Sequence, residues 1–439
     1  MPLSVLSNSA VREILLNLSY EDVVDLQKSL GDALHEYSTG DTNASCCASF
    51  QPERTVLKKK NATSLFMPSS AGGAIGVKVV TMETSPPTSS AASVMSKKSS
   101  VSSASTGIDA LQLTPASSES TGDPRSSISG ESFRPPSSVI GSESPAPKGM
   151  ITIMDAFGNP VGILNAGELT AFRTALGATF ILQRRKDVHT ITVFGAGKIA
   201  YWHIRLALIL RHKEIHHVNI INRSFDNAIK LMKRFQPGHG GKQEWSHVKF
   251  SAVSPEFGEY GRLLKVEVRK ADVIFCCTPS RTPLFPHEFL TSHEGRRKGR
   301  YISAVGSYSP DMIELHPEII KTAVKADSDH NRHHHKHARQ EGVVIVDTLD
   351  GCLKEAGEII QAKLTPDQLV EVGELIMVKR SVHKEIQAGG EGEKGLLEWL
   401  ERGNVLYKSV GLGLMDLVVG GEVVRLGRDR GVGTIIPDF

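Results

Sequence analysis

The sequence predicts an α/β protein in which a doubly wound parallel sheet is joined to a second, α+β domain. A strand, a glycine turn, a long apolar helix and another strand follow one another between Ile191 and Ser224. Apolar, β-branched runs then continue to alternate with helical patterns further along the chain. Because such alternation is typical of parallel sheets with helices on both faces, we expect a Rossmann-like domain over residues 176–365.

The N-terminal part of the chain predicts helices and then strands. Residues 8–37 carry two helical patterns, and Ser19 followed by Asp22 is typical of an N-cap. Strands are expected at 54–57, 65–68 and 75–80. Lys78 lies inside the third strand, where a lysine is costly unless it faces solvent or meets an anion. From the strand alone, an exposed sheet face remains the alternative for Lys78.

The segment 82–148 differs in composition from the rest of the chain. Ser, Thr, Pro and Gly dominate it, and large apolar residues are few. Such a segment cannot bury enough surface to offset its chain entropy, so we expect a disordered insertion. Order resumes with a hairpin of strands at 151–155 and 161–164, followed by a helix that we expect to open at Thr170.

The glycine turn has the spacing of a dinucleotide-binding fingerprint. Gly195 permits the sharp turn, Gly197 lets the backbone approach a pyrophosphate, and Ala200 allows close packing of helix on strand. The helix N-terminus adds free N–H groups for the phosphates. A glycine turn without a ligand is the alternative, but the surrounding strand–helix–strand unit argues against it. The expected cofactor contacts are Gly195, Ala196, Gly197, Lys198 and Ile199.

The end of the second strand favours one form of the cofactor. An Asp or Glu at this place would accept hydrogen bonds from the ribose of NAD, but the chain has Asn222, Arg223 and Ser224. No carboxylate repels a 2′-phosphate here, and Arg223 could pair with one. We therefore favour NADP(H) over NAD(H), with a solvated turn residue as the alternative for Arg223.

Further strands are expected at 248–250, 272–278, 301–306 and 343–347. Between the last two, the histidine-rich segment 330–337 could bind a metal, but it has no carboxylate or cysteine partners nearby, so a solvated loop is favoured and no metal site is predicted. From residue 366 the chain predicts helices and a tail, with a last strand within 431–439.

Composition and charge argue against several classes of protein. The 439 residues carry a net charge of +3, which gives no basic surplus for a nucleic-acid partner. The five cysteines show no C-x-x-C spacing, so reduced thiols are favoured over disulfides or a zinc site. No signal peptide is recognisable, and there is no apolar run of about 18 residues to span a membrane. We expect a cytoplasmic protein without a membrane partner.

A set of short motifs, in order along nearly the whole chain outside the two insertions, resembles the ornithine cyclodeaminase/mu-crystallin family. The motifs are Pro52-Glu53-Arg54, Met67-Pro68, Gly76-Val77-Lys78, Leu169–Ala175, Gly195-Ala196-Gly197, Ala304-Val305-Gly306, Glu314-Leu315, Glu355–Glu358 and Lys408–Gly411. The resemblance implies a homodimer whose substrate and dimerisation domain is built from both chain ends, residues 1–81, 149–175 and 366–439, around the Rossmann-like domain.

The resemblance also implies the site residues. Arg54, Lys78 and Arg173 would face the substrate, with the arginines binding its α-carboxylate and Lys78 orienting it or delivering a proton to its nitrogen. This lessens the weight of the exposed-face alternative for Lys78. Further expected cofactor contacts are Thr174, Thr278, Val305 and Ser409.

One departure from the family bears on the reaction. Cyclodeaminating members carry an Asp two residues beyond the Val-Gly pair, where this chain has Tyr308. The mu-crystallin-like members also lack that Asp, and they reduce cyclic imino acids with a nicotinamide. The expected function is therefore an NAD(P)H-dependent reductase of small, cyclic α-imino acids. Two alternatives remain: an ornithine cyclodeaminase, which is an ammonia lyase forming proline with recycled NAD, and a non-enzymatic, NADP-dependent ligand-binding protein.

Overall fold

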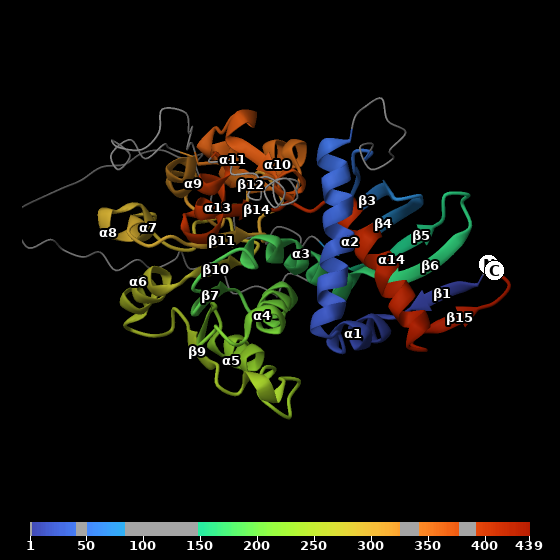
Figure 1. Cartoon of the computed structure of the whole chain (residues 1–439), viewed down its shortest axis with the longest axis horizontal. Helices are drawn as coiled ribbons and strands as arrows, with labels where there is room; N and C mark the ends of the chain where they lie inside the picture. The colour runs from blue at the N-terminus through green and yellow to red at the C-terminus, as the bar shows by residue number, and fades with distance from the viewer. Residues whose placement is uncertain (1, 41–50, 84–147, 325–341, 377–391) are drawn as a thin grey trace, which may run out of the picture.

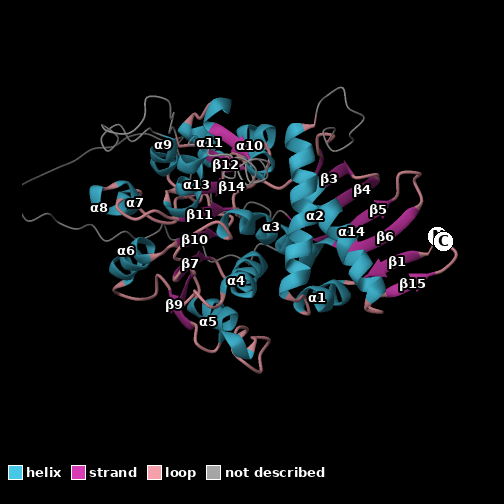
Figure 2. Ribbon diagram, viewed as in Figure 1, coloured by secondary structure: helices cyan, strands magenta, loops and turns pink. Residues whose placement is uncertain are grey.

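The computed structural model describes residues 2–40, 51–83, 148–324, 342–376 and 392–439. Its helices and strands form two parts that lie side by side, each organised around one β-sheet (Figures 1 and 2). Nearly all of the segment 82–148, expected to be disordered, lies outside the described residues, and so does the histidine-rich segment 330–337.

Sheet B has eight strands in the order β13-β12-β14-β11-β10-β7-β8-β9. Every neighbouring pair is parallel. The strand order runs outward from β7 to β9 and then returns to β10 beside β7, so the chain reverses its direction of winding between β7 and β10. The predicted doubly wound parallel sheet is confirmed. The strands are β7 (Thr190–Phe194), β8 (His217–Ile221), β9 (Lys249–Val253), β10 (Val273–Cys276), β11 (Tyr301–Ala304), β12 (Val344–Val346), β13 (Leu369–Glu371) and β14 (Val405–Lys408).

Sheet A has seven strands in the order β15-β1-β6-β5-β4-β3-β2. Neighbours are antiparallel apart from the parallel pair β1–β6. Strand β1 pairs with β15, so the two ends of the chain meet at one edge (Figure 1). The strands are β1 (Leu3–Leu6), β2 (Thr55–Lys59), β3 (Ala62–Ala71), β4 (Ala74–Glu83), β5 (Lys148–Met154), β6 (Pro160–Asn165) and β15 (Thr434–Ile436).

Four helices pack together beside sheet A, and one of them, α3, also contacts β11 of sheet B. They are α1 (Asn8–Leu16), α2 (Tyr20–Thr39), α3 (Ala166–Leu182) and α14 (Gly413–Asp429). Helix α14 lies against β3, β4 and β5, while α3 contacts both α14 and α4 (Lys198–Arg211), which follows the glycine turn. Leu169 and Phe172 of α3 share one core with Leu414 and Leu417 of α14. Because α3 is buried on nearly all sides, its polar side chains lie inside the molecule.

The remaining helices flank sheet B or follow its strands. They are α5 (Phe225–Lys233), α6 (Tyr260–Lys270), α7 (Glu288–Thr291), α8 (His293–Arg296), α9 (Pro317–Val324), α10 (Leu349–Glu355), α11 (Gly357–Ala362) and α13 (Gly392–Arg402). In the part of the chain that the structure describes, no helix combines the length and the apolar character needed to cross a bilayer.

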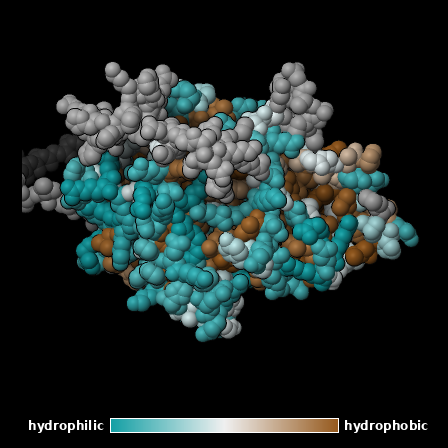
Figure 3. Space-filling model, viewed as in Figure 1, coloured by the Kyte–Doolittle hydropathy of each residue, from teal (hydrophilic) through white to brown (hydrophobic). Residues whose placement is uncertain are grey.

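The face of sheet A turned away from α14 is apolar and exposed. Phe66, Val79 and Met150 lie directly opposite one another on β3, β4 and β5, and Ile75 shares their face of β4. Met150 is 49% exposed, and Phe66 and Ile75 are also exposed. Figure 3 shows hydrophobic residues gathered over this end of the molecule, while the rest of the visible surface is mostly hydrophilic.

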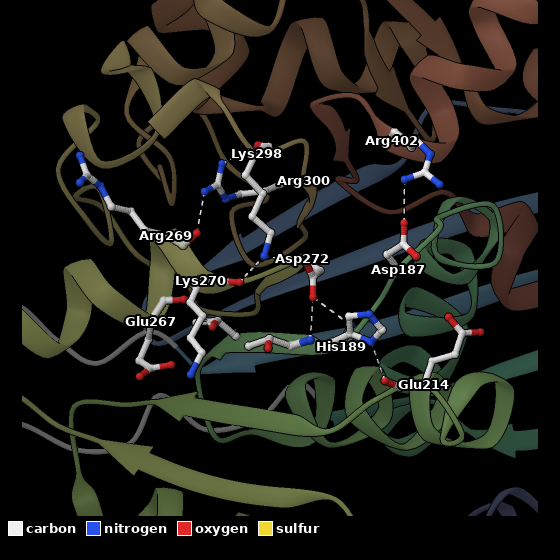
Figure 4. Close-up of polar contacts among 12 residues, drawn as sticks. Asp187, His189, Glu214, Glu267, Arg269, Lys270, Asp272, Lys298, Arg300 and Arg402 are labelled. Carbon is white, nitrogen blue, oxygen red and sulfur yellow. Dashed lines mark hydrogen bonds and ion pairs between the residues drawn. The ribbon is translucent and has the colours of Figure 1, made fainter. Parts of the chain in front are cut away.

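The N-terminal edge of sheet B is closed by a polar network (Figure 4). Asp272 accepts hydrogen bonds from the backbone N–H groups of His189 and Thr190, at 2.9 and 2.8 Å, and pairs with Lys298 at 2.6 Å. Arg300 is buried and donates to the carbonyl oxygen of Arg269 at 2.7 Å. Polar and charged side chains thus close this edge of sheet B, and the opposite edge carries the candidate site.

Several elements differ from the sequence prediction. Helix α3 opens at Ala166 rather than Thr170, because the Asn165 side chain accepts from Gly167 N and caps the helix four residues earlier. The expected helical return from residue 366 is interrupted by β13 and β14, and β14 lies in the middle of sheet B. In the sequence, β14 is a run of only four residues that ends in Lys408, so the local pattern does not indicate a buried strand. The predicted N-cap at Ser19, with Asp22, is confirmed as a capping box.

Candidate active site

Two predicted substrate residues meet at a buried carboxylate. The ammonium nitrogen of Lys78 lies 3.1 and 3.0 Å from the two carboxylate oxygens of Asp416. The Nε of Arg173 donates to the same carboxylate at 3.2 Å. All three side chains are at least 96% buried, since their exposed fractions are 4%, 4% and 1%. We call Lys78, Arg173 and Asp416 the buried triad.

Local structure explains why the triad assembles. On β4, Lys78 shares a face with Gly76 and Val80, and this face is turned toward α14, so the exposed-face alternative for Lys78 is wrong. Asp416 lies in the first turn of α14, where the positive end of the helix dipole favours a carboxylate. Just before that helix, Gly411 has a φ of +97°, and a Cβ there would lie 3.1 Å from Nη2 of Arg173. A side chain at position 411 would thus strain the backbone and press on the Arg173 guanidinium.

The electrostatics of the triad make Lys78 unusual. Burial disfavours the charged ammonium and lowers the pKa of Lys78 to about 8; the nearby Asp416 opposes this change, and the like charge of Arg173 adds to it. Lys78 can therefore exchange a proton near neutral pH, which an ordinary surface lysine does not do.

Arg54 does not join the triad in this structure. Its guanidinium pairs with Glu355 at 2.5 Å, at the end of α10, and both side chains are 23% exposed. Beside it, Glu53 pairs with Lys354 at 2.6 Å. Arg54 thus connects the strand segment leading into sheet A with a helix that follows a strand of sheet B. Burial raises the pKa of Glu355, and the adjacent Arg54 opposes that rise.

The glycine turn has the geometry that a dinucleotide needs. Gly195 has a φ of +108°, and its N–H donates to Ile221 O at 2.9 Å, which ties β7 to β8. A Cβ at Gly197 would meet nothing within 4 Å, so open space lies over this residue. Gly197 is the N-cap of α4, and no side chain caps that helix. Free N–H groups facing open space fit a pyrophosphate.

Other residues of the turn also take part in packing. Ala196 and Ile199 are partly buried against the core. The side chain of Lys198 reaches back to Glu168 of α3 at 2.9 Å, and the same buried carboxylate accepts from the Trp202 indole at 3.1 Å. The pair therefore fixes α3 against the start of α4.

The segment after β8 forms a compact loop. Asn222 N donates to Val253 O at 3.1 Å, and its side-chain amide donates to Ser224 O at 2.8 Å. The hydroxyl of Ser224 accepts from Asn227 N at 3.3 Å and caps α5. Arg223 is exposed at the tip of this loop. The three residues lie beside the end of β7, as the strand order requires.

Three of the remaining predicted contacts lie at the carboxyl ends of neighbouring parallel strands. Thr278 follows β10, Val305 follows β11, and Ser409 follows β14. The Val305 N–H donates to Cys276 O at 3.0 Å, and the Ser409 hydroxyl donates to Asp347 at 2.6 Å. Thr174 lies elsewhere, on α3 beside Arg173, and its hydroxyl donates to Thr170 O at 2.8 Å.

The structure adds charged residues that sequence reasoning missed. Asp416 was not among the predicted site residues, yet it pairs with both cations of the triad. Asp347, at the end of β12, accepts from the Ser409 hydroxyl and from Gly411 N at 2.8 Å, so it fixes the loop that contacts Arg173. The sequence does not show that these carboxylates are buried. A carboxylate whose partners are distant in sequence has the local pattern of a surface residue. Glu314, Glu358 and Lys408 lie in motifs that carry the family resemblance, but the sequence assigned them no role; in the structure they form a second buried cluster.

Tyr308 lies two residues beyond the Val305-Gly306 pair, and burial raises its pKa. Nearby, Arg281 and Asp311 pair at 2.8 Å. Across the described ranges, no group of three or more His, Cys, Asp or Glu side chains is placed to hold a metal ion.

Comparison with known proteins places this geometry in a family. A model of the ornithine cyclodeaminase/mu-crystallin family matches residues 150–423. The uncharacterized protein YGL159W of Saccharomyces cerevisiae is 27% identical over 301 residues, covering 64% of this chain and 74% of that protein. A Delta(1)-pyrroline-2-carboxylate reductase of Bacillus cereus is 25% identical over 278 residues, covering 63% and 70%.

A solved structure shows the same fold over the whole molecule. The Thermococcus litoralis Delta(1)-pyrroline-2-carboxylate reductase, in complex with NADH and L-proline, is 19% identical and superposes with a TM-score of 0.61. The match covers 99% of this chain and 100% of that chain. Because the family model spans more than half of the sequence and the predicted motifs fall in one fold, the chain belongs to the ornithine cyclodeaminase/mu-crystallin family.

Proposed function

We propose that the protein is an NAD(P)H-dependent reductase of small α-imino acids, with cyclic imines as its preferred substrates. The observation that carries the proposal is the buried triad, in which a lysine with a pKa of about 8 lies beside an arginine. That combination suits a substrate with a carboxylate next to a C=N bond. The names of the Bacillus and Thermococcus relatives, both pyrroline-2-carboxylate reductases, support the same reaction class.

Each residue of the triad has a distinct proposed role. Arg173 binds the α-carboxylate, since a guanidinium offers a planar pair of donors to a carboxylate. Lys78 donates a proton to the imine nitrogen as the C=N bond is reduced. Asp416 holds both cations in place and offsets part of their charge. The bound nicotinamide supplies the hydride, while these side chains orient the imine and provide the proton.

Arg54 is a second proposed carboxylate ligand. In this structure the Arg54 guanidinium is paired with the Glu355 carboxylate at a distance of 2.5 Å. For Arg54 to reach the substrate, the substrate carboxylate must compete with Glu355 for the guanidinium. We therefore propose that Arg54 contributes to the Michaelis constant more than to the chemical step.

The cofactor site is proposed to prefer NADP(H) over NAD(H). Asn222, Arg223 and Ser224 place no carboxylate at the ribose position after β8, and Arg223 is exposed there. The phosphates are assigned to the uncapped start of α4, and the nicotinamide to the loops that carry Thr278, Val305 and Ser409. Thr174 is proposed to border the cofactor from α3.

We also propose that two copies of the chain associate through the exposed face of sheet A. Phe66, Val79 and Met150 give this face a continuous apolar strip across three strands. Exposed apolar patches of this kind are typical of protein interfaces. The division into a Rossmann-like domain and a substrate and dimerisation domain built from both chain ends is part of the same proposal, as is a cytoplasmic location.

The test is a substrate panel followed at 340 nm, with cyclic imino acids, L-amino acids and both cofactors. The expected result is net consumption of NADPH with a cyclic α-imino acid, and a steep rise of KM in Arg173→Ala. Proline and ammonia formed from ornithine without net cofactor consumption would instead establish a cyclodeaminase. Tight cofactor binding without any turnover would establish a binding protein.

A further inference from the structure

A second cluster of buried charges lies beneath the loops assigned to the nicotinamide. Glu314, Glu358 and Lys408 come from three separate segments, and each side chain is fully buried. Buried charges are costly unless they are paired and hydrogen-bonded. None of the three belongs to the buried triad, so their presence at this edge of sheet B needs an explanation.

Glu314 joins two loops through their backbones. One carboxylate oxygen accepts from Thr278 N at 2.7 Å and from the Thr278 hydroxyl at 3.1 Å. The other accepts from Gly306 N at 2.7 Å. Thr278 follows β10 and Gly306 follows β11, so a single carboxyl group bridges the ends of two neighbouring strands.

The two loops are in direct contact at this point. A Cβ on Gly306 would lie 2.2 Å from Thr278 O and 2.3 Å from Thr278 N, so only a glycine fits. The Glu314 carboxyl group therefore stabilises the direct contact between the backbones of Thr278 and Gly306. It contacts Thr278, which is assigned to the cofactor, and Gly306, which directly follows the assigned residue Val305.

Glu314 is itself held in place by Glu358, which in turn pairs with Lys408. Glu358 accepts from the backbone N–H of Glu314 at 2.7 Å and from the Ser307 hydroxyl at 2.6 Å. Lys408 pairs with Glu358 at 3.4 Å and donates to the carbonyl oxygen of Ser307 at 2.8 Å. Since Lys408 ends β14, the cluster ties the ends of three adjacent strands together.

The donors around Glu314 favour its ionised form, although burial raises its pKa to about 7. All three described contacts of the carboxyl oxygens come from N–H or O–H groups. If the Glu314 carboxyl group were protonated, its own hydrogen would point at one of these donors. A neutral amide at this position would likewise present an NH2 group to one of the donors, so it cannot hold both loops equally well.

We propose that Glu314 is a positioning residue for the nicotinamide end of the cofactor: its carboxylate fixes Thr278 and Gly306, and Glu358 and Lys408 fix Glu314. This inference rests on the proposed cofactor, and it adds residues that do not touch the cofactor themselves. It predicts that loss of the carboxylate affects binding of the nicotinamide while leaving the adenosine and pyrophosphate contacts unchanged.

The experiment compares two ligands on the full-length chain by calorimetric titration. NADPH carries the nicotinamide, and 2′-phospho-ADP-ribose lacks it. In Glu314→Gln, we expect the dissociation constant of NADPH to rise roughly tenfold or more, because hydrogen bonds to a charged group are lost. The dissociation constant of 2′-phospho-ADP-ribose should stay within about twofold of the wild-type value, because a substitution far from a binding contact usually changes its free energy only slightly.

Asp272→Asn is the matched control. Asp272 is a carboxylate that also accepts from two backbone N–H groups, but at the opposite edge of sheet B. Its replacement should lower the melting temperature without separating the two ligands. If Glu314→Gln does not fold, the same comparison is made with Glu358→Gln. Glu358 does not contact Thr278 or Gly306, but it accepts the hydrogen bond that holds the Glu314 backbone.

The outcomes separate the positioning role from the proposed function. If a folded variant loses affinity for both ligands alike, or for neither, the positioning role is wrong while the cofactor assignment stands. If the wild-type protein binds neither ligand, the proposed cofactor is wrong, and the positioning role falls with it.

Discussion

Lys78 shows how much one buried residue depends on its neighbours. Its ammonium is removed from water by the packing of α14 on β4, which lowers its pKa to about 8, and Asp416 limits the change. A proton donor is most effective when its pKa lies near the working pH. Arginine does not give up its proton in proteins, so the roles proposed for Lys78 and Arg173 follow from their chemistry.

The first prediction concerns the pH dependence of turnover. The donating form of Lys78 is the ammonium, which is present below its pKa and lost above it. We therefore expect kcat to fall as pH rises through about 8. Lys78→Met should lower kcat by roughly a hundredfold or more, the usual contribution of a general acid, and should abolish that limb of the profile. Steady-state rates between pH 6 and 10 provide the measurement.

Lys58→Met is the control for this prediction, since Lys58 lies on the exposed strand β2. Its pH profile should match that of the wild-type protein. A fall in kcat near pH 8 that persists in Lys78→Met would assign the titration to another group.

The second prediction concerns Arg223 and the choice of cofactor. Arg223→Ala should weaken NADPH binding roughly tenfold, because a charge-assisted contact to the 2′-phosphate is lost. NADH has no 2′-phosphate, so its binding should change little. Fluorescence titration of both cofactors measures the difference. Equal losses for the two cofactors, or tighter binding of NADH by the wild-type protein, would reject the preference for NADP(H).

At the scale of elements, the connection between β14 and α14 links the two halves of the candidate site. Ser409 begins it, Gly411 lies against the Arg173 guanidinium, and Asp416 completes the buried triad. Asp347 fixes the start of this connection through its bonds to Ser409 and Gly411. A change in its course would therefore shift the buried triad relative to the loops that follow β10 and β11.

The third prediction tests that connection. Gly411→Ala should cost about 1–2 kcal/mol of stability, because its φ of +97° is unfavourable for a residue with a Cβ. The added methyl group would also press on Arg173, so KM for the imino acid should rise. Gly421→Ala is the control, since it lies within α14 and a Cβ there would meet nothing within 4 Å. Equal KM values in the two variants would contradict the link.

The fourth prediction concerns the junction of β4 and β5. These strands are antiparallel neighbours, with Thr81 opposite Lys148, and Glu83 pairs with Lys148 at 3.2 Å. Antiparallel neighbours need only a short turn between them. Replacing residues 84–147 by a short glycine-serine linker should therefore preserve folding and turnover, as measured by thermal melting and rate assays. An aggregated or inactive protein would show that this segment contributes to the fold.

The sequence predicted the elements whose signals are local. The glycine turn needs residues with a positive φ or no side chain, so its chemistry is visible in six consecutive positions from Gly195 to Ala200. Lys78 and Arg173 were found through the family resemblance. Asp416 was missed because its partner Lys78 lies 338 residues away, and a contact across that distance leaves no mark on the local pattern.

At the scale of the whole molecule, sheet A leaves an apolar face without a covering helix in the described part of the chain. Phe66, Ile75 and Met150 are exposed there, and Figure 3 shows hydrophobic residues grouped at the same end of the molecule, with hydrophilic residues beside them. Exposed apolar surface of this kind is unfavourable in water. A second copy of the chain is the proposed partner that would cover it.

The fifth prediction is that charge on this face prevents association. Phe66→Lys combined with Met150→Lys should convert a dimer to a monomer, because two ammonium groups per subunit would have to be buried in the interface. Light scattering after size-exclusion chromatography measures the mass. Val266→Lys, at an exposed apolar position of α6, is the control and should leave the mass unchanged. A wild-type monomer, or a dimer that survives both substitutions, would contradict the interface.

The position of Asp416 also bears on how the protein is made. Lys78 and Arg173 are synthesised long before Asp416, yet both lie buried against it in the finished molecule. Until α14 has left the ribosome, the two cations have no carboxylate partner and β4 lacks the helix that covers it. A nascent or prematurely terminated chain thus contains the glycine turn of sheet B before it contains all three residues of the buried triad. A chain that ends before α14 therefore lacks the carboxylate partner of Lys78 and Arg173.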